Sequence, residues 1–214
     1  MFTRSPRNPI LTRDDMPVPA QAVFNPGVTE QDGQVVLLLR IEHANGYSSI
    51  YVARSDDGES DWQVESEPLL RYGQPDMRYE QWGCEDARVV WLADEGQWYI
   101  CYTAVSPAGH AVGLARTRDL ERVERVGLIF PPNYKDAALF PRRINGRWAA
   151  LHRPDAGGGI ENIWIACSRD LAYWGEPHCV LPEGAGPAWD GVKVGAGPPP
   201  LRTDQGWLLI YHGV

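Results

Sequence analysis

The run Gly96-Gln97-Trp98-Tyr99-Ile100-Cys101-Tyr102-Thr103 recurs three more times along the chain, in altered form. The other copies span residues 33–40, 146–153 and 205–212. Each copy is a turn followed by apolar and aromatic residues, which is typical of a β-strand that follows a tight turn. A second motif, Ser/Thr-x-Asp, follows the first three copies at residues 55–57, 117–119 and 168–170. Because two independent motifs recur in step, the chain is organised as structural repeats.

Each repeat is predicted to contain four antiparallel strands. In the second repeat, Arg88–Leu92 and Gln97–Thr103 flank a turn at residues 93–96, and a third strand begins at Val112. Repeated four-stranded units indicate an all-β fold made of β-propeller blades. We therefore predict a single propeller domain over residues 1–214, with about three and a half blades. Pro198-Pro199-Pro200 is expected in the first strand of the last repeat, as an edge strand.

Composition excludes several classes of protein. The 214 residues carry a formal net charge of −8, which argues against nucleic-acid binding through phosphate contacts. No apolar run is long enough for a membrane helix, and Met1–Pro6 lacks the apolar core of a signal peptide, so a cytoplasmic protein with four reduced cysteines is expected. The histidines His43, His110 and His178 lack metal-ligand spacing and are expected in loops, so no metal site is predicted.

Polar residues recur where the first strand of each repeat starts and where the second strand ends. In a hairpin these two positions lie at the same end, so the repeats should bring them together as one site. Any one of these side chains taken alone is more often a solvated strand end. The Ser/Thr-x-Asp segments are expected to be structural turns, because they recur in each repeat. The residues that converge in this scheme are Asn25, Arg40, Glu85, Asp86, Lys135, Asp136, Arg153, Lys193 and His212.

Eight short motifs that stand in order along the chain resemble glycoside hydrolase family 130. They are Asn8-Pro9-Ile10, Phe24-Asn25-Pro26-Gly27, Gly83-Cys84-Glu85-Asp86-Ala87-Arg88, Lys135-Asp136-Ala137-Ala138-Leu139-Phe140-Pro141, His152-Arg153-Pro154, Trp189-Asp190, Lys193-Val194-Gly195-Ala196-Gly197-Pro198-Pro199 and Tyr211-His212-Gly213. The resemblance implies a five-bladed β-propeller that acts on β-mannosides, as a phosphorylase or as a β-1,2-mannosidase. It also implies that this chain is a C-terminally truncated member, whose open edge could pair with a second copy.

The resemblance further implies inverting phosphorolysis that releases α-mannose 1-phosphate. Asp86 would be the general acid and would pass its proton through a sugar hydroxyl. Inorganic phosphate would be a co-substrate, with no cofactor, and cations would hold it beside the developing oxocarbenium centre. The phosphate ligands implied are Lys135, Arg153, Lys193 and His212, and the substrate-binding residues are Asn25, Arg40, Glu85, Arg88 and Asp136.

Three alternatives remain open from the sequence. A β-mannoside hydrolase would need a second carboxylate as base, whereas the ring of cations favours phosphorolysis. An inactive propeller fragment could bind mannosides as a lectin does. A propeller that only binds other proteins would not be expected to gather polar residues at one end of its axis, and the matched polar positions argue against this alternative.

Overall fold

The structure, a computed structural model, describes residues 3–155, 157, 161–184 and 187–214. Strands dominate this part of the chain, and its helices are two 3-10 turns, η1 (Arg13–Asp15) and η2 (Arg78–Glu80). The all-β prediction is confirmed.

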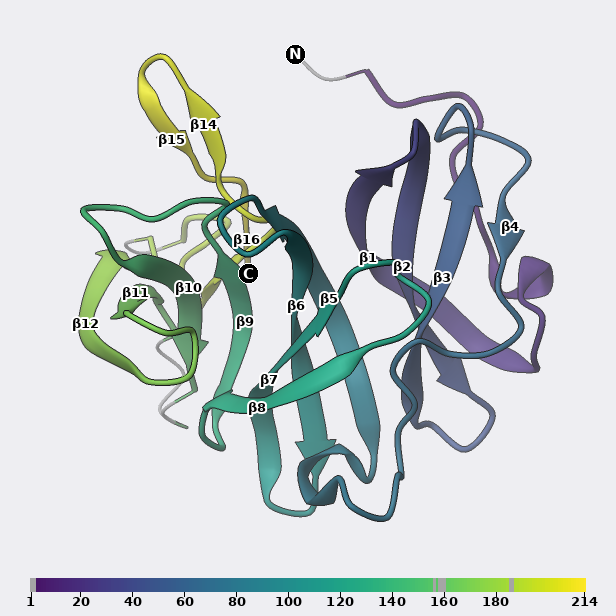
Figure 1. Ribbon diagram of the computed structural model, residues 1–214, viewed down its shortest axis with the longest axis horizontal. Coiled ribbons are helices and arrows are strands. Elements are labelled where there is room, and N and C mark those ends of the chain that lie inside the picture. The colour runs from purple at the N-terminus through teal and green to yellow at the C-terminus, as the bar shows by residue number, and fades with distance from the viewer. Residues whose placement is uncertain (1–2, 156, 158–160, 185–186) are drawn as a thin grey trace.

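Three consecutive four-stranded units account for most of the fold (Figure 1). Consecutive strands pair antiparallel within each unit, as the repeats predict. A single parallel bridge between Ser48 and Gly83 joins the first two units into one sheet. The strands are β1 (Ala20–Gln31), β2 (Gln34–His43), β3 (Ser48–Ser55) and β4 (Gln63–Val64) in unit 1; β5 (Gly83–Leu92), β6 (Gln97–Ser106), β7 (Gly109–Thr117) and β8 (Glu124–Phe130) in unit 2; and β9 (Tyr134–Leu139), β10 (Trp148–Pro154), β11 (Ile163–Ser168) and β12 (Trp174–Leu181) in unit 3.

Unit 4 is a broken hairpin. β13 (Val194–Ala196) pairs with β16 (Tyr211–Gly213), and β14 (Leu201–Thr203) pairs with β15 (Gly206–Leu208). The β14–β15 end extends away from the rest of the molecule in Figure 1. The prediction that Pro198-Pro199-Pro200 lies within a strand is wrong, because the triplet falls between β13 and β14. Three successive residues without a backbone N–H cannot continue the ladder.

The units pack face to face, and the first strands of successive units contact one another: β1 with β5, β5 with β9, and β9 with β13. Alternation along β2 shows the principle. Val36 and Leu38 face unit 2 and pack in one cluster with Val89 and Ile100. The odd-numbered residues Leu37, Leu39 and Ile41 belong to a separate cluster on the other face of the strand.

The N-terminal segment covers that second face of unit 1. Ile10, Leu11, Met16 and Val18 pack against the cluster that contains Leu37 and its neighbours. Figure 1 shows this segment passing along unit 1 before β1 begins. On unit 4, by contrast, apolar side chains are exposed, with Leu201 at 53%, Leu208 at 47% and Ile210 at 43%.

Two further cores join the remaining units. Trp148 of β10 is fully buried and packs in one cluster with residues of unit 2, among them Leu92 and Tyr99. Between units 3 and 4, Leu151 and Ile163 pack with Val194. Apolar interfaces between the stacked sheets therefore hold each unit against the next one along the chain.

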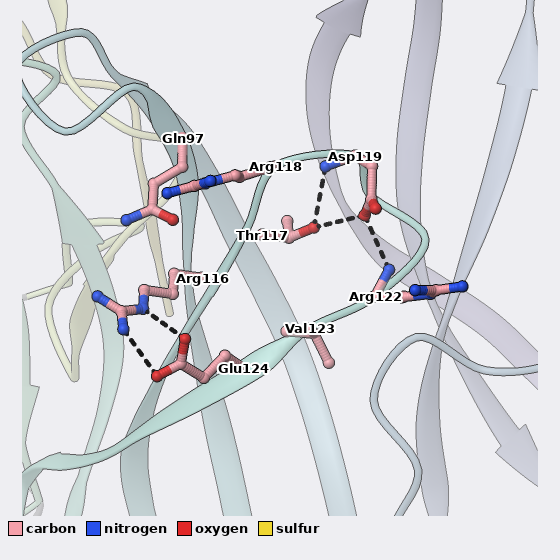
Figure 2. A pocket seen from close by; sticks show the side chains of 8 residues that line it. All are labelled: Gln97, Arg116, Thr117, Arg118, Asp119, Arg122, Val123 and Glu124. Atoms are coloured by element: carbon pink, nitrogen blue, oxygen red, sulfur yellow. Dashed lines mark hydrogen bonds and ion pairs between the residues drawn. The ribbon is translucent and has the colours of Figure 1, made fainter.

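The Ser/Thr-x-Asp segments are structural turns, as predicted. In unit 2, the Thr117 hydroxyl accepts the Leu120 N–H at 3.0 Å, and Asp119 Oδ1 accepts the Glu121 N–H at 2.9 Å. Asp119 Oδ1 also accepts the Arg122 N–H at 2.9 Å, which Figure 2 shows. Ser168 and Asp170 repeat this pattern in unit 3, and Ser55 and Asp57 repeat it in unit 1.

A hollow accompanies each of these turns. The hollow in unit 2, lined by Gln97 and Arg116 among others, measures about 380 Å³ and is drawn in Figure 2. Its counterparts beside Asp57 and Asp170 measure about 170 and 310 Å³. Because the hollow recurs in each of the three units, it belongs to the architecture of the repeat and is a poor candidate for a specific site.

Replacing Asp119 by Ala should lower the free energy of unfolding by about 1 kcal/mol, because two backbone N–H groups lose their acceptor. Asp119→Asn keeps an oxygen at the same place and should cost less than half as much. Urea unfolding of the two variants checks this. Equal stability of Asp119→Ala and the parent would contradict a structural role for the turn.

Candidate functional site

A β-bulge lies at the same place in the first strand of units 1, 2 and 3. Phe24 pairs with Arg40, Glu85 with Thr103, and Lys135 with Arg153, and after each of these pairs the register shifts by one residue. The residue that follows has a left-handed backbone in every case, with φ of 48° at Asn25, 51° at Asp86 and 52° at Asp136. Asn and Asp tolerate this conformation better than other side chains do. Three units thus place an amide or a carboxylate at one equivalent position.

Asp86 is held by residues of unit 1. The Asn25 side-chain amide donates to Asp86 Oδ1 at 2.9 Å, and an Arg40 NH1 group donates to the same oxygen at 3.1 Å. Arg40 also contacts Glu85 Oε1 at 2.9 Å through its NH2 group. The side chain of Asp86 is 11% exposed. Among the described residues no hydrogen bond reaches Asp86 Oδ2, so one carboxylate oxygen is fixed and the other has no donor.

Two carboxylates and one guanidinium therefore share a half-buried space. Burial raises the pKa of Glu85 above its usual range, and the charge of Asp86 adds to this, whereas the charges of Arg40 and Lys135 oppose it. Arg40 also lies over the ring of Phe24, with its guanidinium carbon 4.4 Å from the ring centroid. That stacking fixes the plane from which Arg40 reaches both carboxylates.

A second cluster lies between units 3 and 4. Arg153 of β10 is 4% exposed in its side chain and forms two ion pairs, NH1 with Asp136 Oδ2 at 2.7 Å and Nε with Glu161 Oε2 at 2.8 Å. His212 of β16 approaches the same Asp136 oxygen at 3.5 Å. Gly195 allows this approach, because a Cβ there would lie 2.4 Å from Asp136 Oδ2 and 2.5 Å from the imidazole.

Burial alone would raise the pKa of Asp136, but His212, Arg153 and Lys135 outweigh it, so that this pKa lies below its usual range. Lys135 acts on Glu85 as well, since its charge lowers the pKa of that carboxyl. Lys135 precedes Asp136 and pairs with Arg153 in the strand register, and its strand β9 contacts β5, so the two clusters lie on neighbouring strands of one candidate site.

The pKa of Asp136 has a consequence for stability. An unfolded Asp has a pKa of about 3.9, and the folded value is lower, so the stabilisation is complete above about pH 3.9 and is lost as the pH falls through the folded value. The difference in unfolding free energy between the parent and Asp136→Asn should therefore shrink between pH 6 and pH 3. Urea unfolding at both pH values measures it, with the exposed Asp204→Asn as control. A difference that stays constant across this range would contradict the account.

The structure brings together seven of the predicted site residues through side-chain contacts. They are Asn25, Arg40, Glu85 and Asp86 in the first cluster and Asp136, Arg153 and His212 in the second. The side chains of Lys135 and Lys193 form no hydrogen bond or ion pair among the described residues. Arg88 stands apart, because its Nε is buried without a partner and it pairs with Cys101 in the strand register.

Two carboxylates near these clusters were missed from the sequence. Glu161 lies in the β10–β11 connection and has no counterpart in the repeats, so no register signal marks it. Asp155 follows β10 and contacts His110 Nε2 at 3.4 Å. The expectation that His43, His110 and His178 lie in loops is wrong, since they lie in β2, β7 and β12. Among the described residues, no group of three His, Cys, Asp or Glu side chains could hold a metal ion.

A buried network supports the strand that carries Glu85 and Asp86. Glu80 is 4% exposed and accepts the Tyr102 hydroxyl at 2.5 Å and Arg125 Nε at 2.8 Å. The Cys84 thiol lies 3.3 Å from Glu80, and burial raises its pKa well above the usual range. Cys84 is therefore a packed thiol rather than a nucleophile. All four cysteines are free.

Comparisons with known proteins identify the family of this chain. The model of the glycoside hydrolase family 130, described as β-1,4-mannooligosaccharide phosphorylase, matches residues 4–214. A β-1,2-mannobiose phosphorylase of Listeria innocua is 40% identical over 78% of this chain and 45% of its own length. A β-1,4-mannooligosaccharide phosphorylase of Ruminococcus albus is 30% identical over 97% of this chain and 62% of its own length. The chain thus spans about half to two thirds of these relatives.

Solved structures show the same fold. A β-1,2-mannobiose phosphorylase from Listeria innocua, in complex with β-1,2-mannobiose, superposes with a TM-score of 0.88 at 31% identity and covers 99% of this chain and 74% of its own. A second solved structure is described as coming from work on hydrolases of this family that target β-1,2-mannosidic linkages in Candida mannan. It has a TM-score of 0.84 at 23% identity and covers 98% of this chain and 68% of its own. In the described residues, no helix is long and apolar enough to span a membrane. The chain belongs to glycoside hydrolase family 130.

Proposed function

We propose that this protein is an enzyme that cleaves β-mannosidic bonds with inorganic phosphate, with inversion, and releases α-mannose 1-phosphate. The observation that carries the proposal is that two charged clusters, one around Asp86 and Arg40 and one around Asp136 and Arg153, lie on the contacting first strands β5 and β9. The names of its relatives as mannoside phosphorylases support the same reading.

Asp86 is assigned as the general acid. Asn25 and Arg40 both donate to Oδ1, which leaves Oδ2 to carry the proton. As the bond between the anomeric carbon and the leaving oxygen breaks, this proton passes to the leaving oxygen, directly or through a sugar hydroxyl. Two donors on the opposite oxygen stabilise the carboxylate that remains. Asn25, Arg40, Glu85, Arg88 and Asp136 are proposed to bind the sugar.

Phosphate is proposed to attack the anomeric carbon from the face opposite the leaving group. A phosphate oxygen forms the new bond while the old one breaks, so the β linkage yields an α-phosphate. The phosphate arrives as an anion and needs no general base, but it needs cations that stabilise it beside the forming oxocarbenium centre. Lys135, Arg153, Lys193 and His212 are proposed to supply that charge.

We also propose that the units are blades of a five-bladed propeller whose first strands surround the axis. The contacts of β1 with β5, β5 with β9 and β9 with β13 support this arrangement. The proposed partners are a β-mannoside and phosphate, and nucleic acid is not proposed as a partner. The proposed location is the cytoplasm. The exposed apolar residues of unit 4 are compatible with pairing to a second copy.

Calorimetric titration of the chain tests the proposal. β-1,2-Mannobiose and inorganic phosphate should each bind, and each should bind in the presence of the other. Binding of mannobiose without binding of phosphate would favour a hydrolase or a glycan-binding protein. A chain that binds neither would contradict the proposed site.

A further inference from the structure

Glu161 has no part in the reaction as proposed so far, although it contacts the most buried cation of the site. Its Oε2 lies 2.8 Å from Arg153 Nε. The side chain of Arg153 is 4% exposed and that of Glu161 is 17% exposed. In the described part of the chain, Nε and NH1 of Arg153 are buried and have no hydrogen-bond partner. The contact is therefore an ion pair held by charge, which is screened less by solvent than a pair at the surface.

The backbone of Glu161 reaches the next unit. Its carbonyl oxygen accepts the Val194 N–H at 2.9 Å, and residues 161 and 193 form a parallel bridge. Glu161 therefore connects Arg153 of unit 3, through its side chain, with the strand start that carries Lys193 of unit 4, through its main chain. These are two of the four cations assigned to phosphate, and they come from different units.

The guanidinium of Arg153 is held on two sides. Asp136 lies 2.7 Å from NH1 and Glu161 lies 2.8 Å from Nε. Neither contact has hydrogen-bond geometry, so the two carboxylates hold the guanidinium between them by charge. The NH2 group forms no ion pair with a carboxylate among the described residues, so its donors are free for an anion.

We propose that Glu161 is a positioning residue, which orients Arg153 toward inorganic phosphate and ties it to the Lys193 segment. The inference rests on the proposed function, since it assigns Arg153 to phosphate. Glu161 itself touches neither phosphate nor sugar. Its effect should depend on its negative charge, because the contact with Arg153 is an ion pair without hydrogen-bond geometry.

Two variants remove the charge of Glu161. Glu161→Ala should weaken the affinity for inorganic phosphate about tenfold, comparable to the loss of a carboxylate that orients a metal ligand. Glu161→Gln keeps the shape of the side chain but not its charge, and should weaken this affinity to a similar extent. The affinity for β-1,2-mannobiose should change less than twofold in both. Calorimetry measures the affinities of the parent and of both variants for phosphate and for mannobiose. Glu176→Ala is the matched control, because Glu176 is exposed and pairs with Arg147.

A second measurement needs no phosphate. ¹⁵N relaxation of the arginine Nε groups, with the Arg153 signal assigned through Arg153→Lys, should show an ordered Arg153 side chain in the parent and a mobile one in both variants. Unchanged Arg153 mobility in both variants would overturn the inference, as would phosphate affinities of both variants within twofold of the parent. Tighter phosphate binding by both variants would overturn it too, because the carboxylate would then compete with the anion. A parent with an ordered Arg153 side chain and no phosphate binding would contradict the proposed function and leave the positioning contact standing.

Discussion

Asp86→Asn should reduce the rate of mannoside cleavage by about 10²–10⁴-fold, because the amide keeps the shape of the side chain but cannot supply a proton. Asn25 and Arg40 would still find an oxygen at the place of Oδ1, so the cluster should keep its geometry. Affinity for the mannoside should change little. The effect therefore falls on turnover rather than on binding, and steady-state kinetics with calorimetry distinguishes the two.

A matched control for this variant lies at the opposite end of the strands of unit 2. Asp119→Asn makes the same chemical change in the turn beside β7 and should leave turnover unchanged. Wild-type turnover in Asp86→Asn would remove Asp86 from the role of general acid. Glu85 would then be the nearest candidate, since its pKa is already raised by burial.

Arg153→Ala should have two large effects. It removes the charge shared by Asp136 and Glu161, and breaking a buried ion pair typically costs about 3–5 kcal/mol because the partner stays buried and uncompensated. It should also weaken phosphate binding by one or two charge-assisted hydrogen bonds, at about 1.5–3 kcal/mol each. Urea unfolding at neutral pH and phosphate calorimetry measure the two effects separately.

The loss of stability in Arg153→Ala should be smaller at low pH, where the stranded carboxylates can protonate. Arg147→Ala provides the control, because Arg147 pairs with Glu176 at the surface and such pairs contribute at most about 1 kcal/mol. A cost for Arg153→Ala no greater than that of Arg147→Ala would show that the buried cluster does not stabilise the fold. Unchanged phosphate affinity would remove Arg153 from the anion site.

The sequence predicts the fold well where the repeats carry the information. Asp86 and Asp136 each stand 12 residues before the tryptophan that follows the turn of their repeat, Trp98 and Trp148. The structure places both aspartates in equivalent bulges. The repeat also predicts that the Ser/Thr-x-Asp segments are turns. Both features depend on a local backbone conformation that recurs in each unit. The sequence of one unit, compared with the next, is therefore enough to predict them.

Features without a repeat could not be predicted in this way. Glu161 lies in a connection that differs between units, and its contact with Arg153 depends on how that connection folds back. The cover that Ile10 and Met16 form over unit 1 depends on the path of a non-repeating segment. Arg88 was assigned by family motif alone, and its buried Nε has no hydrogen-bond partner in the described part of the chain.

Product analysis tests the central proposal most directly. The protein is incubated with β-1,2-mannobiose, with and without inorganic phosphate, and the products are followed by ³¹P NMR and sugar chromatography. The account predicts α-mannose 1-phosphate when phosphate is present and no cleavage when it is absent. Free mannose that accumulates at the same rate in phosphate-free buffer would contradict phosphorolysis and establish a hydrolase in its place.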